Sequence, residues 1–399
     1  MNGKDPWKIV WLLAFTQVVS WGSLYYAFAI VAGDIERETG WRTEIVFGAF
    51  SWSLLIAGLA STPAGMLIDR IGGRLVMASG SVLAGLGMVG IGSAHSVALY
   101  FLSWSAAGVG MAMVLYEAAF ATINREFLLS PRKGISVLTL FGGLASTVFW
   151  PLTLKLNSVL GWRDTFLVYG AIHLLLCTPV HALLRSSGQR RHPPAATHTS
   201  RNFTLREAVR DAAFWKLAVA FAANVFVFSV LSVHLIPLLQ RFGHSATMAV
   251  LVATLIGPMQ VAGRIGELAF ARHVRPQTVG KLTFAMLPAG LLALLFLGQH
   301  SYAVAAFCIL YGLSNGVLTI VRGTVPQSLF GRENYGAISG ALAAPSLAAK
   351  AAGPLAAAAI VQADPSPSWL LSILLGVSLV SLASFLAAVT GKRSVHASL

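Results

Sequence analysis

Six charged side chains, counting Lys, Arg, Asp and Glu, lie well inside long apolar stretches of this 399-residue sequence. Four are basic and two are acidic: Lys155, Arg264, Arg322, Lys350, Glu117 and Glu267. Arginine carries a planar fork of donors that matches a carboxylate, and lysine carries a compact positive charge. A surplus of positive charge in a water-filled cavity attracts anions. These residue types predict a site for an anion rather than for a lipophilic cation.

Lys350 and Arg264 are the two bases that we expect to bind substrate. Lys350 lies near the middle of an apolar stretch that contains no Asp or Glu, so its partner is either a carboxylate from another stretch or the ligand. Arg264 is followed three residues later by Glu267, on the same helical face. Arg264 therefore binds the ligand, or it pairs with Glu267 in a gate near the cytoplasm, and we expect Glu267 to act in coupling or gating.

Glu117 and Arg322 lie at similar depths in two stretches that an internal repeat relates. We expect them to act in coupling or gating, or to form a structural pair. Tyrosine and asparagine offer donors to an oxyanion. The side chains that we expect to contact substrate are Tyr25, Tyr26, Tyr311 and Asn315, and further polar or aromatic side chains that could line a cavity include Trp52, Tyr116, Trp150, Asn224 and His234.

The sequence shows no pattern typical of an enzyme. It has no glycine-rich phosphate loop followed by lysine, and no cluster with metal-ligand spacing. Its two cysteines, Cys177 and Cys308, lie inside apolar stretches and build no disulfide framework. We therefore expect no catalytic activity, no cofactor and no metal.

The composition is that of a membrane protein. Only 11% of the residues are charged, whereas a soluble domain has about 25%, and the mean hydropathy is +0.74. Because about 20 apolar residues span a bilayer, we predict twelve membrane-spanning helices and an all-α fold. The predicted spans are roughly 7–33, 43–68, 75–94, 97–124, 134–160, 163–184, 214–240, 246–271, 277–298, 302–328, 335–362 and 369–390.

Two six-helix bundles are predicted, at residues 1–184 and 214–399, joined by a basic and proline-rich cytoplasmic linker at 185–213. A short surface helix is expected from Leu205 to Ala213. The Ile-Ser and Pro-Leu pairs at 135–136 and 151–152 recur at 338–339 and 354–355, an offset of 203 residues. Such a parallel repeat predicts a pseudo-symmetric transporter with a substrate site near the midplane between the halves.

The orientation follows from the basic residues in the loops. With the N-terminus in the cytoplasm, 20 of the 28 Lys and Arg residues lie in cytoplasmic segments and four lie in outer loops. The positive-inside rule therefore places both termini in the cytoplasm. The basic residues are spread between apolar stretches, which indicates membrane topology rather than nucleic-acid binding. The short loops predict a bacterial inner membrane. We expect a monomer whose partners are a small-molecule substrate and the lipid bilayer.

The loop after the second span carries a motif that reads Gly65-Met-Leu67-Ile-Asp69-Arg70-Ile-Gly72-Gly73-Arg74. This motif resembles the G-x-L-x-D-R-x-G-R-[RK] signature of the major facilitator superfamily, with Gly73 where the family usually has arginine. The resemblance implies the major facilitator fold. It also implies that Asp69, Arg70 and Arg74 act in gating, by holding the two halves together in the outward-open state.

A narrower resemblance rests on three places: Trp21-Gly-Ser-Leu-Tyr25-Tyr26 in the first span, Gln260-Val-Ala-Gly-Arg264 in the eighth, and Lys350 in the eleventh. These are similar to the bacterial monocarboxylate-transporter and oxalate/formate-antiporter branch. That branch uses the arginine for the substrate carboxylate, and its oxalate carrier adds the lysine. The chain has Ile30 and Gln260 where animal-type carriers have Lys and Asp linked to proton coupling, so proton coupling and exchange both stay open.

The predicted function is secondary active transport of a small organic anion, similar to a monocarboxylate, by alternating access. The alternative is an efflux permease for a toxic compound such as a drug or an arsenical. A transporter-like sensor would carry a signalling domain or a long tail, and no such segment is visible in this sequence.

Overall fold

The computed structural model of the chain describes residues 7–126, 131–184, 202–271, 274–364 and 366–390. Within these ranges the regular structure is helical, and eleven helical stretches are long and apolar enough to cross a membrane. One of them, Pro131–Ala182, has 52 residues and turns at Gly161, whose φ is 80° and ψ is 168°. It therefore holds two crossings, and the predicted all-α membrane fold with twelve spans is confirmed.

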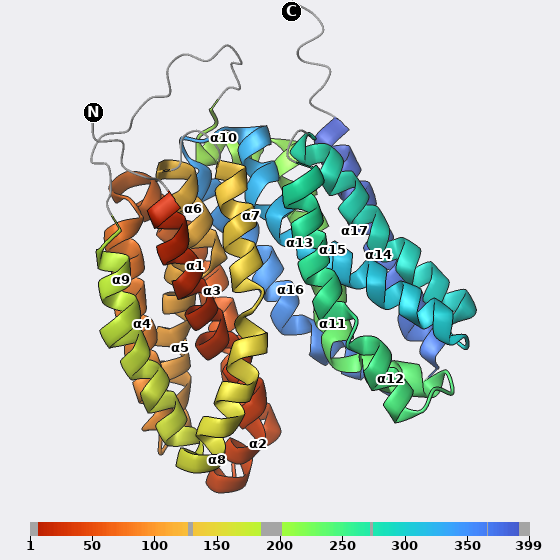
Figure 1. Ribbon diagram of the computed structural model, residues 1–399, viewed down its shortest axis with the longest axis horizontal. Helices are drawn as coiled ribbons and strands as arrows, with labels where there is room; N and C mark the ends of the chain where they lie inside the picture. The colour runs from red at the N-terminus through yellow and green to blue at the C-terminus, as the bar shows by residue number, and fades with distance from the viewer. Residues whose placement is uncertain (1–6, 127–130, 185–201, 272–273, 365, 391–399) are drawn as a thin grey trace, which may run out of the picture. The chain divides into compact units, whose positions relative to one another are not determined.

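The first compact unit comprises Met1–Thr204 and Phe330–Ala344. Figure 1 shows its helices in red to yellow-green. They are α1 (Trp7–Trp21), α2 (Ala27–Thr39), α3 (Thr43–Ile71), α4 (Gly73–Gly92), α5 (Val97–Val114), α6 (Tyr116–Glu126), α7 (Pro131–Gly142), α8 (Ala145–Ile172) and α9 (Thr178–Ala182). Two π-helical turns join α1 to α2 at Gly22–Tyr26 and α8 to α9 at His173–Cys177. Helix α4 packs against α5, α8 and α9.

The second compact unit comprises Leu205–Leu329 and Pro345–Leu399. Its helices are α10 (Leu205–Arg210), α11 (Ala212–Arg241), α12 (Ala246–Ala253), α13 (Ile256–Phe270), α14 (Pro276–Leu297), α15 (Ser301–Phe330), α16 (Tyr335–Ala363) and α17 (Pro367–Thr390). Helix α17 packs against α11 and α14. Helix α16 begins in the first unit and continues into the second.

The structure adds detail at the end of the first span and in the linker. The first span was predicted to end near residue 33, but α2 continues to Thr39 and ends at Gly40, whose φ is 68°. The helix extends because Asp34 pairs with Arg37 one turn later and Glu38 receives donors from a neighbouring span. The predicted surface helix from Leu205 is observed as α10, and residues 185–201 of the predicted linker lie outside the described residues.

Buried hydroxyl and imidazole groups connect the two π-helical turns. The Ser23 hydroxyl lies 2.9 Å from Nε2 of His173, and both side chains are buried. The hydroxyl also donates to the carbonyl of Val19. A π-helical turn places one extra residue in a helix, and such turns are frequent at functional sites. This contact fixes the part of the first span that carries Tyr25 and Tyr26.

Candidate substrate-binding site

Arg264 is the most unusual side chain of the second unit. It lies in α13 with 6% of its surface exposed, yet its Nε and Nη1 atoms have no hydrogen-bond partner among the described residues. Within the same ranges, no ion pair joins it to Glu267, three residues later and also buried. A buried guanidinium with unused donors is costly in an apolar environment. Its geometry suits an anionic ligand.

Glycines bring α13 and α15 together beside Arg264. A Cβ added at Gly316 would collide with the carbonyl of Gln260, and one added at Gly263 would lie 2.9 Å from the carbonyl oxygen of Leu313. Small residues let membrane helices approach this closely. The backbone contact fixes the depth at which α13 presents Arg264.

Lys350 is half-buried in α16, at a position where proline weakens the helix. Pro354, four residues later, has no N–H to donate to the carbonyl of Lys350. The hydroxyl of Ser229 in α11 supplies the missing donor at 2.7 Å. The backbone around Lys350 is thus held by α11, while the ammonium adds a second positive charge to the unit that contains Arg264.

Tyr311 and Asn315 lie one turn apart on α15 and differ in environment. Tyr311 is 5% exposed, and its hydroxyl donates to the carbonyl of Phe228 at 3.2 Å. Its ring lies 4.5 Å from the Phe228 ring, measured between centroids. Asn315 is half-buried. Tyr311 therefore fixes α15 against α11, and the role of Asn315 as a substrate contact stays a prediction.

In the first unit, Tyr25 and Tyr26 belong to an aromatic cluster built by irregular helices. Both are half-buried in the π-helical turn, with their ring centroids 5.3 Å apart. The ring of Trp21 lies 5.6 Å from Tyr25 and 5.0 Å from Tyr116. Gly142 leaves room for the Tyr116 ring, since a Cβ there would collide with its hydroxyl. Tyr25 and Tyr26, two of the predicted substrate contacts, thus belong to one aromatic cluster with Trp21 and Tyr116.

Glu117 and Arg322 fall in different compact units. Glu117 lies in the first turn of α6, directly after Leu115 interrupts the fourth span with an extended backbone, φ −79° and ψ −166°. Arg322 lies in α15, and both side chains are half-buried. Their role in coupling or gating stays a prediction.

Asp69, in the motif after the second span, caps the start of α16. Its Oδ1 accepts from the N–H of Gly336 at 3.0 Å, and its Oδ2 accepts from the N–H of Ala337 at 2.8 Å. Gly65 packs directly on the backbone of Gly336. A carboxylate at a helix N-terminus is favoured by the unpaired N–H groups and by the helix dipole. Asp69 therefore ties α3 to the first turn of α16.

The other motif residues behave differently. Arg70 and Arg74 are exposed, whereas Gly73 is buried and a Cβ there would collide with the side chain of Thr122. This close approach explains why the chain departs from the family signature at Gly73. Sequence analysis did not assign a role to Arg125, whose guanidinium donates to the carbonyls of Ile68 and Asp69 at the end of α3.

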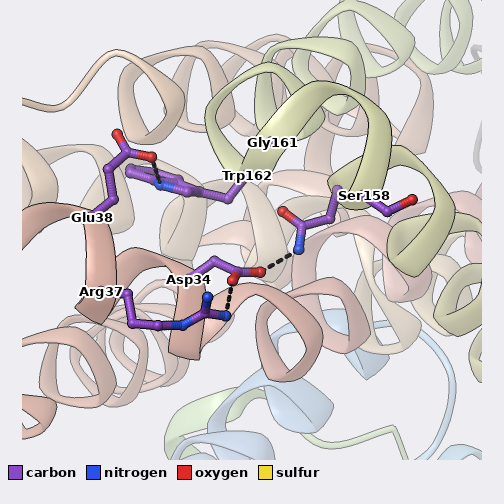
Figure 2. A pocket seen from close by; sticks show the side chains of 7 residues that line it. Asp34, Arg37, Glu38, Ser158, Gly161 and Trp162 are labelled. Atoms are coloured by element: carbon purple, nitrogen blue, oxygen red, sulfur yellow. Dashed lines mark hydrogen bonds and ion pairs between the residues drawn. The ribbon is translucent and has the colours of Figure 1, made fainter.

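A pocket of about 430 Å³ lies at the end of α2. Figure 2 shows Asp34, Arg37, Glu38 and Trp162 around it. Asp34 accepts from Arg37 and from Asn157, and Glu38 accepts from the indole of Trp162 at 2.7 Å. Its carboxylates are satisfied by neighbouring side chains, so we assign it to the packing of α2 against α8.

Two further polar side chains of the second unit stand out by burial. Asn224 in α11 and Ser346 in α16 are each 1% exposed. Neither amide atom of Asn224 nor the Ser346 hydroxyl has a hydrogen-bond partner in the described parts of the chain. The sequence indicated Asn224 only as one of several residues that could line a cavity. Ser346 was missed, although its spacing of four residues from Lys350 places both on one face of a helix.

Comparison with known sequences gives consistent relatives. The Major Facilitator Superfamily profile matches residues 10–354. Monocarboxylate transporter 4 of Rattus norvegicus is 28% identical over 337 residues, which cover 79% of this chain and 69% of that protein. The uncharacterized MFS-type transporter YhjX of Escherichia coli is 29% identical over 85% of this chain and 86% of its own length. The oxalate:formate antiporter of Oxalobacter formigenes is 27% identical over 58% of this chain and 54% of its own length.

Solved structures show the same fold. The human organic anion transporter MFSD10 superposes with a TM-score of 0.71 at 18% identity, over 96% of this chain and all of that one. FucP in its outward conformation gives 0.68 at 12% identity, over 95% of this chain and 98% of its own. The predicted family resemblance is confirmed by sequence and by fold. The chain is a multi-pass membrane protein with the fold of a transporter, and it belongs to the major facilitator superfamily.

Proposed function

We propose that the protein is a secondary transporter for a small organic anion that carries one carboxylate. The observation that carries the proposal is the guanidinium of Arg264, which is buried to 94% and keeps its Nε and Nη1 donors unused among the described residues. A carboxylate that accepts from either edge of the guanidinium would use one of these donors together with Nη2, in the planar fork that arginine offers to carboxylates.

The surrounding charges support an anion. Lys350 adds positive charge in the same unit, and a charged residue inside a membrane span is a functional candidate by default, since it costs about 2.5–3.5 kcal/mol at the helix centre. Relatives named as monocarboxylate transporters and as an oxalate:formate antiporter are compatible with this substrate class. We further propose that the protein lies in a bacterial inner membrane with both termini in the cytoplasm. Its transport would be driven by proton coupling or by exchange.

The test is uptake by proteoliposomes of short carboxylates and of their uncharged amides, with wild type, Lys350→Arg and Lys350→Ala. Removing the base should reduce carboxylate uptake by about tenfold or more, since one interaction of 1.4 kcal/mol corresponds to a factor of ten. Lys350→Arg should retain most of the uptake because it keeps the charge.

Uptake of the uncharged amide should change little in either variant, Lys350→Arg or Lys350→Ala. Wild-type uptake of carboxylates by the Lys350→Ala variant, or transport of lipophilic cations alone, would contradict the proposal. Efflux of a toxic compound would then become the leading function.

A further inference from the structure

The ends at which α1 and α7 begin combine exposed positive charge with exposed aromatic surface. The two helices pack against each other, and Figure 1 shows them beside one another. They open the first and fifth crossings, so both begin at the same face of the membrane. Neither helix contains an acidic residue, whereas Lys8 and Lys133 are both exposed in the first turns. No carboxylate of either helix therefore neutralises the positive charge at this end.

Lys133 is held by a tryptophan rather than by an acid. Its Nζ lies over the ring of Trp7, 5.4 Å from the centroid, which is within the range of a cation–π interaction. Neither Lys133 nor Lys8, which directly follows Trp7, has an ion pair among the described residues. The ring thus places one ammonium group beside the start of α1, where its N–H groups can donate to an anion.

Further into the span, α1 presents an apolar face. Lys8, Trp11 and Phe15 are three and seven residues apart, so they lie on one side of the helix. Trp11 is 51% exposed and Phe15 is 46% exposed. The Trp11 ring also contacts Phe141 of α7, with the two centroids 5.3 Å apart. At about 1.5 Å of rise per residue, this face runs from a cation to rings roughly 10 Å deeper in the membrane.

An anionic phospholipid has the chemistry that matches this surface. Its phosphate is an anion at the membrane–water boundary, where basic pockets between spans bind lipid headgroups. Its acyl chains continue into the bilayer beside the exposed rings. A zwitterionic lipid brings a cation of its own, which the two ammonium groups repel, and a free phosphate has no chain. A second membrane helix would cover the rings but leave the lysines without a counter-charge.

We propose that Lys8, Lys133, Trp11 and Phe15 form a binding site for an anionic phospholipid, called the α1–α7 patch. The two ammonium groups bind the phosphate, and the rings of Trp11 and Phe15 contact an acyl chain. The α1–α7 patch lies in the first unit and does not depend on the identity of the transported substrate.

The second half of the sequence supplies a matched comparison. The seventh crossing, α11, carries Trp215 and Lys216 in its first turn, both exposed, as α1 carries a tryptophan and a lysine. At the repeat offset of 203 residues, Gly336 takes the position of Lys133. The indole of Trp215 donates to the carbonyl of Val209 at 2.8 Å. This half thus lacks the second lysine, and we expect no comparable lipid site there.

The experiment titrates lipids into the full-length protein in detergent and measures bound lipid by native mass spectrometry. The probes are phosphatidylglycerol, phosphatidylcholine with the same acyl chains, and glycerol 3-phosphate, which is a headgroup without a chain. Wild type should bind phosphatidylglycerol about tenfold or more tightly than phosphatidylcholine, because two basic residues attract the anionic headgroup. Glycerol 3-phosphate at the same concentration should not compete, because it cannot contact the rings.

The variants separate charge from apolar contact. Lys8→Gln/Lys133→Gln should reduce the preference for phosphatidylglycerol to less than about twofold, whereas Lys8→Arg/Lys133→Arg should keep it because both charges remain. Lys216→Gln is the matched control and should leave the preference unchanged. Trp11→Ala should weaken the binding of both lipids, because the contact between ring and chain does not depend on the headgroup.

Equal affinity of wild type for the two lipids would overturn the inference, and so would a preference that persists in Lys8→Gln/Lys133→Gln. Full competition by glycerol 3-phosphate would overturn it by assigning the lysines to a free anion. A wild-type dimer that Trp11→Ala converts to a monomer would overturn it by assigning the rings to a second copy of the chain. Wild type decides the first outcome by itself, so the test holds even if a variant does not fold.

Discussion

At the scale of single residues, Arg163 and Arg264 differ in how many of their guanidinium donors have a hydrogen-bond partner. Arg163 is well satisfied: it donates to Glu38 at 2.7 Å and to the carbonyls of Gly92 at 3.1 Å and Ala94 at 2.7 Å. Arg264 is more deeply buried and leaves two nitrogens unused within the described residues. We therefore expect the first arginine to stabilise the fold and the second to lower the stability of the ligand-free protein.

This contrast predicts opposite effects of the same substitution. Arg264→Met should leave the unfolding free energy unchanged or raise it by about 1–3 kcal/mol, because it removes unsatisfied buried donors. Arg163→Met should lower it by about 2–3 kcal/mol, because it leaves carbonyls and a carboxylate unpaired. Thermal or denaturant unfolding in detergent measures both. Strong destabilisation by Arg264→Met would show that Arg264 is structural.

At the scale of the helices, the spans were predictable and their irregularities were not. The apolar length needed to cross a bilayer locates each span from the sequence, and the structure agrees within a few residues. The π-helical turn at Gly22–Tyr26 and the interruption at Leu115 have no comparable signal. They depend on packing, since a Cβ at Gly22 would collide with the ring of Phe149.

Some residues of the candidate site were likewise predictable from the sequence, and others were not. Arg264 and Lys350 were identifiable because a charge in an apolar stretch is conspicuous. The burial of Asn224 and Ser346 with unpartnered polar atoms among the described residues was not, because burial depends on how the helices pack. That packing is held by contacts such as Tyr311 with Phe228 and Ser229 with Lys350. A single sequence does not show which helices are neighbours or how far each is shifted along the other.

The contact between α11 and α16 gives a prediction at this scale. Ser229→Ala should lower the unfolding free energy by about 1 kcal/mol, since the carbonyl of Lys350 loses its donor. In a Pro354→Ala background the loss should be smaller, because the restored N–H can serve the same carbonyl. A double-mutant cycle in unfolding measurements tests this coupling. Equal losses in the two backgrounds would exclude the compensation.

At the scale of the whole molecule, Asp69 acts on a helix that belongs to both compact units. It caps the first turn of α16, and α16 continues from the first unit into the second. A change in this cap should shift the equilibrium between conformations without touching substrate.

We therefore predict that Asp69→Asn slows turnover by about tenfold while the substrate Kd changes by less than about twofold. The amide offers one acceptor where the carboxylate offers two. Uptake rates and equilibrium binding on the same preparations separate the two effects. Asp164→Asn removes an exposed carboxylate and should change neither. Weakened binding at an unchanged transport rate would place Asp69 at the substrate instead.

The most direct test of the central claim is ligand-dependent thermal unfolding of the purified protein. Short carboxylates and their uncharged amides are titrated into wild type and Arg264→Met. A ligand that binds the folded state raises its stability as RT ln(1 + [L]/Kd). The account predicts that at least one carboxylate raises the unfolding midpoint of wild type, that its amide does not, and that Arg264→Met loses the response. An equal response to acid and amide, or an undiminished response in Arg264→Met, would contradict it.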